Sequence, residues 1–318
     1  MNEKAQKFTI GIVGVMSAGK STLLNALMGR ALLPARNLAT TAAAMYIYHD
    51  SDAAQFTARA ACTREALEDV CFELADRDLL DAWNDVFPFI EIRGCLPFLR
   101  DAGIHGSVTL VDTPGPNNSM DERHGLTTRS VLQFGDISLL LHVWNASQLA
   151  TRDDRNFLRE VEAWRQTSPV PELFVLNRMD CFDPEKESLA ESLKSMQRYL
   201  AEENVSFPQI TGTSARLALY FRMREALSAR ERERLEDFVE ECGRFRDFYE
   251  RAYANVDPVL DGAFTELVGT LKREHRMQEL SFLNTGVPML EAVILDHVRR
   301  LCPKIVSQKE EDACIRLS

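Results

Sequence analysis

The segment from Gly14 to Ser21 reads GVMSAGKS and has the composition of a loop that binds phosphate groups. Its glycines allow successive backbone N–H groups to curl around phosphate oxygens. The Lys20 ammonium can then reach the β- and γ-phosphates of a nucleotide, and the Ser21 hydroxyl can ligate Mg²⁺. The residues that we expect to contact the nucleotide here are Gly14, Ser17, Ala18, Gly19, Lys20, Ser21 and Thr22.

The segments on either side of this loop suit an anion-binding site. An apolar run, Phe8 to Val13, predicts a buried strand that leads into the loop. A helical pattern from Ser21 to Met28 follows directly, and the positive N-terminal end of that helix would point at the same anion. A chance glycine-rich turn is the alternative interpretation, but it explains neither the strand before the loop nor the helix after it.

A second apolar run, from Val108 to Val111, ends in the tetrapeptide DTPG at 112–115. An Asp at the end of a buried strand can hold Mg²⁺ through a water molecule, and a Gly three residues later can offer its N–H to the γ-phosphate. We therefore expect Asp112 to be a metal ligand and Gly115 to contact the nucleotide.

Two later segments carry residues that could recognise a base. The apolar run 173–176 leads into the motif NRMD at 177–180, and the run 209–212 leads into the tripeptide TSA. The carboxylate of Asp180 matches the paired N1–H and N2–H donors of guanine and repels the acceptor that adenine presents there. The Ala215 N–H could meet guanine O6. The residues that we expect at the base are Asn177, Arg178, Asp180, Ser214 and Ala215.

The order of these four motifs is more informative than any one of them. Each follows an apolar strand, and together they predict an α/β fold, a P-loop GTPase (G domain) with a doubly wound, mostly parallel sheet and extra helices. The nucleotide expected is GTP or GDP, and an ATPase of the same fold is disfavoured by Asp180.

The motifs resemble the GTPase domain of the dynamin superfamily. The similarity is greatest to the bacterial dynamin-like proteins and, among these, to the clamp-binding protein, and it extends loosely over about residues 8 to 300. The segments that carry it are GVMSAGKST (14–22), LPARNLATT (33–41), VTLVDTPGPNN (108–118), FVLNRMD (174–180) and ITGTSAR (210–216).

The resemblance implies roles that the residues alone do not. Thr41 matches the threonine that binds Mg²⁺ and positions the attacking water, with Thr40 as the fallback. Ser17 matches a serine that helps to place a charge-compensating monovalent cation. The resemblance therefore implies GTP or GDP and Mg²⁺ as cofactors, with Lys20, Ser17 and Thr41 as catalytic residues and Ser21, Thr41 and Asp112 as metal ligands.

Three positions depart from related patterns. Met16 stands where dynamins often carry Gln, which leaves the rate of hydrolysis open. Arg178 replaces the usual Lys of the base motif, and its planar guanidinium can still lie over a purine. Pro116 follows Gly115 where Ras-like proteins use a Gln, so the chain cannot orient water in that way.

The predicted reaction is hydrolysis of GTP to GDP and phosphate, stimulated when two G domains form a homodimer. The alternative, to which Met16 points, is a nucleotide-gated interaction protein that acts as a switch or scaffold with little hydrolysis. Few residues precede the first strand or follow residue 301, so we expect a shortened member of the family without the dynamin stalk. A separate helical or clamp-type protein is therefore a possible partner.

The composition of the chain argues against several other classes of protein. The 318 residues, 45% of them hydrophobic, suffice for one large core. A net charge of −11 argues against direct binding of nucleic acid and against general attraction to anionic lipid. The seven cysteines show no paired or metal-like spacing, and neither a signal segment nor an apolar run long enough to span a membrane is present. We therefore expect a cytoplasmic protein.

We expect a dynamin-type G domain over 1–301 and a polar tail over 302–318. Within the domain, 51–86 is expected to be a charged helical insertion, 89–92 an edge strand, and 214–276 a helical segment before the last helix. An apolar seam at helical spacing in that segment is expected to dock on the protein's own G domain, or alternatively on a partner or second copy. The seam consists of Leu235, Phe238, Cys242, Phe245 and Tyr249.

Three other features are interpreted as structural. His142 lies within an apolar strand and is expected to be a core or edge histidine whose polar atoms are satisfied. The run RERER at 230–234 is expected to be a solvated helix face. Arg36 is expected to be a solvated loop residue rather than a charge-neutralising finger.

Overall fold

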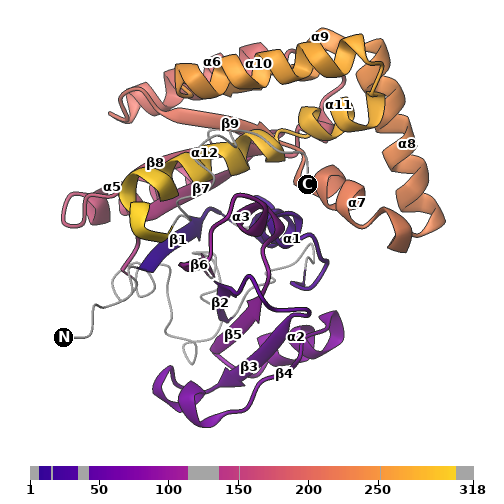
Figure 1. The fold of residues 1–318 in the computed structure, drawn as a ribbon. Helices are drawn as coiled ribbons and strands as arrows, with labels where there is room; N and C mark the ends of the chain where they lie inside the picture. The colour runs from indigo at the N-terminus through magenta and orange to yellow at the C-terminus, as the bar shows by residue number, and fades with distance from the viewer. Residues whose placement is uncertain are drawn as a thin grey trace.

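The computed structural model describes residues 7–15, 17–34, 43–113, 136–149, 151–250 and 252–305. Within these residues, one sheet contains ten strands: β1 (Lys7–Val13), β2 (Ala44–His49), β3 (Thr57–Ala61), β4 (Glu73–Leu74), β5 (Phe89–Gly94), β6 (Ser107–Asp112), β7 (Leu139–Asn145), β8 (Glu172–Asn177), β9 (Gln209–Thr213) and β10 (Tyr253–Ala254). Their order across the sheet is β10-β9-β8-β7-β1-β6-β2-β5-β3-β4. Figure 1 shows this sheet running from β9 near the top to β3 and β4 at the bottom. The mixed α/β class with a mostly parallel sheet is confirmed.

The described helices alternate with the strands through the first part of the chain and dominate its last third. The α-helices are α1 (Lys20–Met28), α2 (Arg77–Asn84), α3 (Pro97–Asp101), α5 (Arg152–Arg165), α6 (Leu189–Glu202), α7 (Ala215–Arg222), α8 (Ala229–Arg244), α9 (Arg246–Tyr249), α10 (Pro258–Arg273), α11 (Met277–Asn284) and α12 (Val287–Leu301). Short 3₁₀ turns are η1 (Glu65–Asp69), η3 (Met179–Cys181), η4 (Arg224–Ala226) and η5 (Pro303–Ile305).

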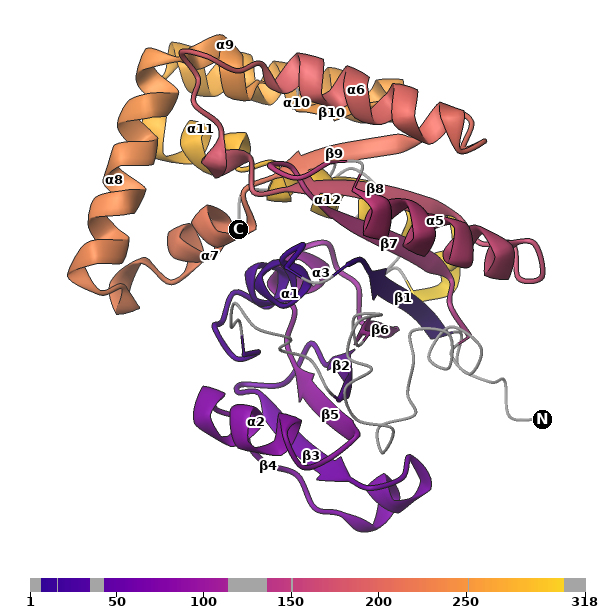
Figure 2. The ribbon, with the colours of Figure 1, turned by 180° about the vertical axis from the view of Figure 1, so that it is seen from behind.

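The central strands bury both faces of the sheet. Strands β9, β8, β7, β1 and β6 are mutually parallel, and their buried apolar side chains alternate between one large cluster on one face of the sheet and smaller clusters on the other. Leu141 and Val175 belong to the cluster that includes residues of α1, α3, α7 and α12, whereas Trp144 and Phe174 pack with residues of α5 and α6 on the other face. Figure 1 shows α12 in front of the sheet, and Figure 2 shows α5 on the opposite side.

The expectation of a helical insertion over 51–86 is wrong. This segment forms β3, η1, β4 and only one helix, α2. Strand β3 pairs antiparallel with β5, and Arg59 forms an ion pair with Glu91 directly opposite it. Cross-strand pairing of this kind outweighs the intrinsic helix propensity of the alanine-rich segment TARAA. The predicted edge strand at 89–92 is consequently not at an edge, because β5 lies between β2 and β3.

The segment 214–276 is largely helical, as expected, although it contains the short strand β10 antiparallel to β9. The apolar seam docks on the protein's own domain. Phe238, Cys242 and Tyr249 share a buried cluster with Met179 and Leu217. Burial raises the pKa of the Cys242 thiol to about 12, which keeps it neutral. Figure 1 shows α8, which carries most of this seam, at the outer edge between α7 and α9.

The first residues of the segment 302–318, which was expected to be a polar tail, pack against the domain. Cys302 and Ile305 are buried, and Ile305 packs closely against Gly106. Residues 306–318 lie outside the described part of the chain. No described helix combines the length and the apolar character that crossing a bilayer requires.

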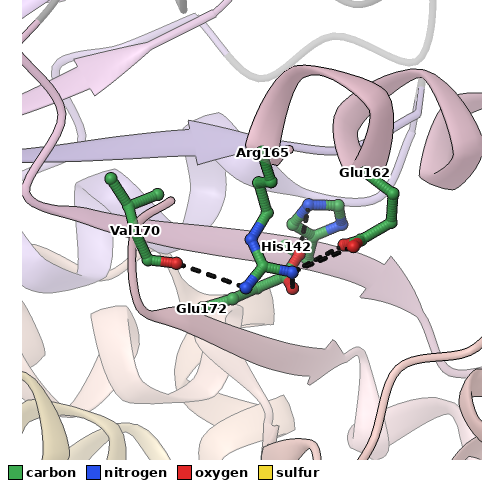
Figure 3. A network of polar contacts seen from close by, with 5 residues as sticks. All are labelled: His142, Glu162, Arg165, Val170 and Glu172. Atoms are coloured by element: carbon green, nitrogen blue, oxygen red, sulfur yellow. Dashed lines mark hydrogen bonds and ion pairs between the residues drawn. The ribbon is translucent and has the colours of Figure 1, made fainter. Parts of the chain in front are cut away.

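A buried polar network joins β7, β8 and α5 (Figure 3). His142 is fully buried, and its Nε2 lies 2.8 Å from Glu172 Oε1. Its Nδ1 has no hydrogen-bond partner among the described residues, so the prediction of a satisfied histidine holds for one ring nitrogen and not for the other. Arg165 Nη1 lies 2.7 Å from the other oxygen of Glu172 and 2.8 Å from Glu162. Glu172 is the first residue of β8, so the network lies at the amino end of that strand.

Candidate nucleotide-binding site

The predicted motifs meet at one edge of the sheet because they follow the carboxyl ends of parallel strands. In register, Ile12 of β1 is opposite Asp112 of β6, and Asn177 of β8 is opposite Thr213 of β9. Residues that are far apart in the chain therefore converge where β1, β6, β8 and β9 end. This edge is where open α/β sheets bind ligands.

Two glycines of the phosphate loop occupy places that no side chain could share. A Cβ on Gly14 would lie 2.3 Å from the backbone oxygen of Val143. Gly19 has φ of +93°, and a Cβ there would lie 2.3 Å from the amide nitrogen of Asn177. Between them, Ala18 is buried and Ser17 is exposed in a left-handed conformation with φ of 63°. The loop is thus packed tightly against β7 and the base motif.

Lys20 folds back over the loop that it follows. Its Nζ donates a hydrogen bond of 3.0 Å to the Gly14 carbonyl oxygen, and the residue is buried. Burial lowers the pKa of Lys20 from its usual range, and the Asp112 carboxylate opposes that shift. An ammonium group held in this way has much to gain from a nearby phosphate anion.

Ser21 and Asp112 form the part of the predicted metal site that the structure describes. The Ser21 hydroxyl donates to Asp112 Oδ2 at 3.2 Å, and both residues are buried. A hydroxyl and a carboxylate are oxygen donors of the type that Mg²⁺ prefers, so these residues suit that ion and would hold it. Thr22 follows in the first turn of α1 and is partly buried.

Asn177 connects the phosphate loop with the two base segments. Its Nδ2 donates to the Ala18 carbonyl oxygen at 3.1 Å. Its Oδ1 accepts from Thr213 Oγ1 and from the Ala215 N–H, each at 3.2 Å. The Ala215 N–H therefore has a protein acceptor here. To make its predicted contact with guanine O6, it would have to give up its hydrogen bond with Asn177 Oδ1. Asn177 itself is only 2% exposed.

Asp180 has a partner that the sequence did not suggest. Arg178 turns the chain in a left-handed conformation with φ of 71°, and Asp180 follows within η3. Asp180 Oδ2 lies 2.9 Å from Arg234 Nη2 of α8. The run 230–234 was interpreted as a solvated face, and Arg234 is indeed 45% exposed, yet its guanidinium is paired. Its position one helical turn before Phe238 of the apolar seam was the available signal.

Ser214 lies between β9 and α7 and is fully buried. Its N–H donates to the Thr285 carbonyl oxygen at 2.7 Å. Among the described residues its hydroxyl has no hydrogen-bond partner, so a polar group is available there. The other predicted positions, Met16, Arg36, Thr40, Thr41, Gly115 and Pro116, lie outside the described part of the chain.

Two cavities of the described structure lie elsewhere. One of about 610 Å³ is lined by residues near the amino ends of β8 and β9, and one of about 820 Å³ lies beside the end of α1. Charged residues of the first are paired as Arg165–Glu172 and Arg300–Asp257, and in the second Arg222 pairs with Glu291. The residues that line these cavities do not include the predicted phosphate or base residues.

Comparison with known proteins identifies the family of this chain. The dynamin family model matches residues 10–179, more than half of the chain. A probable chloroplastic transmembrane GTPase of FZO-like type from Arabidopsis thaliana is 26% identical over 214 residues, covering 66% of this chain and 20% of that protein. Dynamin-like protein A of Bacillus subtilis is 25% identical over 221 residues, which cover 67% of this chain and 16% of that protein. Dynamin-like protein 1 of Campylobacter jejuni is 28% identical over 242 residues, which cover 62% of this chain and 32% of that protein. The matched region is thus at most a third of these relatives' length.

Solved structures give a weaker likeness. A bacterial dynamin pair, described as a mechanism for long-range sensing and tethering of membranes, aligns with a TM-score of 0.48 and 19% identity over 93% of this chain and 48% of that one. Era of Aquifex aeolicus bound to GDP and aluminium fluoride aligns with a TM-score of 0.39 and 15% identity over 66% and 52%. The family model and the motifs carry the assignment: the chain belongs to the dynamin family and carries a GTPase domain of that family.

Proposed function

We propose that this chain binds GTP and hydrolyses it to GDP and phosphate in a Mg²⁺-dependent manner. The observation that carries the proposal is the convergence of Lys20, the Ser21–Asp112 pair and Asn177 at one edge of the sheet. A lysine near the phosphates and oxygen ligands for Mg²⁺ are parts that a phosphoryl-transfer site requires, and the base segment would bind the rest of the nucleotide.

Each of these residues has a proposed role. Lys20 would leave its contact with Gly14 and neutralise charge on the β- and γ-phosphates. Ser21 and Asp112 would hold Mg²⁺, which when bound neutralises charge on the phosphate oxygens. The Asp180 carboxylate would select guanine by accepting hydrogen bonds from the N1–H and N2–H groups of the base. Thr41 is proposed to orient the attacking water and Ser17 to help place a monovalent cation, both by resemblance.

We also propose that two G domains dimerise to stimulate turnover. Pro116 occupies the position at which a Gln could orient water, so the transition state needs a group from elsewhere. The second candidate is a nucleotide-gated switch or scaffold with little hydrolysis, because Met16 replaces a residue that could contact the γ-phosphate. In either case a separate helical or clamp-type protein is a proposed partner. Within the dynamin family, we also propose a specific relationship to the clamp-binding protein.

The test is GTP turnover per molecule over a hundredfold dilution of the protein, with ATP as the competing substrate and K⁺ compared with Na⁺. We expect GTP to be preferred and specific activity to rise with concentration. Lys20→Ala should abolish tight nucleotide binding and serves as the control for a contaminating enzyme. Flat, slow turnover with tight GTP binding would favour the switch, and equal use of ATP would contradict the base assignment.

A further inference from the structure

Helix α8 reaches the loop that carries the proposed guanine-selecting carboxylate. Arg234 and Asp180 are 54 positions apart in the chain, and their side chains meet at 2.9 Å. The Asp180 side chain is only 7% exposed, whereas that of Arg234 is 45% exposed. A largely buried carboxylate is costly to leave unpaired, so this contact affects how Asp180 is held.

The position of Arg234 is set by packing on both sides of the contact. A capping box between Ser228 and Glu231 begins α8 one turn earlier. Phe238, one turn after Arg234 and on the same helix face, is buried in a cluster with Met179. Met179 directly precedes Asp180 and is fully buried. The helix therefore holds two consecutive residues of the base motif, one by apolar packing and one by an ion pair.

A second ion pair joins the same helix to the same loop. Arg244, at the end of α8, contacts Glu185 at 2.9 Å, but the two side chains are 68% and 58% exposed. Exposed pairs of this kind contribute little. Arg244 thus offers a matched control, since it is an arginine of the same helix paired with a carboxylate outside the base motif.

We propose that Arg234 is a positioning residue for guanine recognition, which rests on the proposed role of Asp180. A carboxylate has about four acceptor sites on its two oxygens. Arg234 uses a site on Oδ2, which leaves enough sites for the N1–H and the exocyclic amine of guanine. The guanidinium fixes the carboxylate while the base binds, and α8 thereby links the helical segment to nucleotide affinity.

The experiment measures the affinity of the full chain for GDP and for IDP, whose hypoxanthine base lacks the exocyclic amine. Arg234→Ala should lower the affinity for GDP by about fivefold or more, because a carboxylate without its charged donor is less well oriented. The affinity for IDP should fall by less, because IDP makes only one contact with the carboxylate. Arg234→Lys should restore part of the loss, and Arg244→Ala should leave both affinities within about twofold of wild type.

A double-mutant cycle tests the role of Arg234 separately from the role of Asp180 in selecting guanine. In the Asp180→Ala background, Arg234→Ala should cause no further loss, because Arg234 acts through Asp180. If Asp180→Ala itself leaves GDP affinity unchanged, the base assignment is wrong. If Asp180→Ala weakens GDP but Arg234→Ala does not, or tightens it, the positioning role is wrong. Equal weakening of GDP and IDP, with a lower Tm, would show a merely structural role and also overturn the proposal.

Discussion

At the scale of single residues, Asn177 makes the most contacts that link the separate motifs. Its amide donates to the phosphate loop and accepts from both Thr213 and Ala215. A Cβ at Gly19 would collide with the same amide, so the loop and the base segment fit together at this point. The side chain therefore joins the two halves of the proposed site before any ligand binds.

Asn177→Ala should weaken GDP binding by about tenfold or more and lower the free energy of unfolding by about 1–3 kcal/mol, because it leaves buried donors and acceptors unpaired. Calorimetric titration and urea denaturation measure the two effects. Asn145→Ala is the control, because Asn145 lies on β7 opposite Asn177 of β8. In the part of the chain that the structure describes, its side chain forms hydrogen bonds with Ser147 and Gln148 of its own turn. An equal loss of affinity in both variants would contradict the linking role of Asn177.

At the scale of elements, the start of α12 lies close to the end of β9. Gly286 caps this helix with φ of +73°, and a Cβ there would lie 1.8 Å from the Gly212 carbonyl oxygen. Gly212 is also restricted, because a Cβ there would lie 2.4 Å from Met179 Sδ and 2.9 Å from the Ala252 carbonyl oxygen. Two glycines therefore allow the last helix, the sheet and the base loop to pack together.

Gly286→Ala should destabilise the protein by about 2–4 kcal/mol, because the left-handed conformation and the backbone overlap both oppose a side chain. Gly262→Ala, within α10, meets nothing within 4 Å and should stabilise by about 0.5–1 kcal/mol through helix propensity. Thermal and urea unfolding would compare the same chemical change at the two sites. Similar effects of the same sign would refute the packing argument.

At the scale of the whole molecule, the network in Figure 3 connects two core strands to α5 at the amino end of β8. Burial alone would raise the pKa of Glu172, but the charges of His142 and Arg165 outweigh it and hold the pKa below its usual value. Glu162 behaves in the opposite way, since burial and the charge of Glu172 raise its pKa. The two carboxyl groups therefore respond differently to acid.

A depressed pKa means that the ionised form of Glu172 stabilises the fold above the unfolded-state pKa of about 4.3, and that this stabilisation is lost as the pH falls through the folded value. Glu172→Gln should lower the free energy of unfolding at pH 7 by about 2–4 kcal/mol and reduce the further loss on acidification below about pH 4. Urea denaturation over a pH series measures this. Glu202→Gln, on the exposed face of α6, should reproduce the wild-type dependence of unfolding free energy on pH. A Glu172→Gln variant with that same wild-type dependence would contradict the argument.

The sequence alone determined the parts of this molecule whose signals are local. The glycine spacing of the phosphate loop, and the apolar runs that end at Asp112, Asn177 and Thr213, depend on residues next to one another in the chain. Parallel strands place their carboxyl ends at one edge of the sheet, and the register of β1, β6, β8 and β9 brings the ends of these runs together there.

Tertiary structure decided what depends on contacts between distant segments. The run TARAA has helical propensity, but it becomes β3 because β5 offers it a partner strand. Arg234 has the pattern of a solvated helix residue, but it contacts Asp180 because Phe238 anchors α8 beside Met179. In both cases the energy of a long-range contact exceeds a local preference that is worth less than about 1 kcal/mol per residue. The spacing of Arg234 from Phe238 placed it beside the apolar seam, but the identity of its partner depended on the tertiary structure.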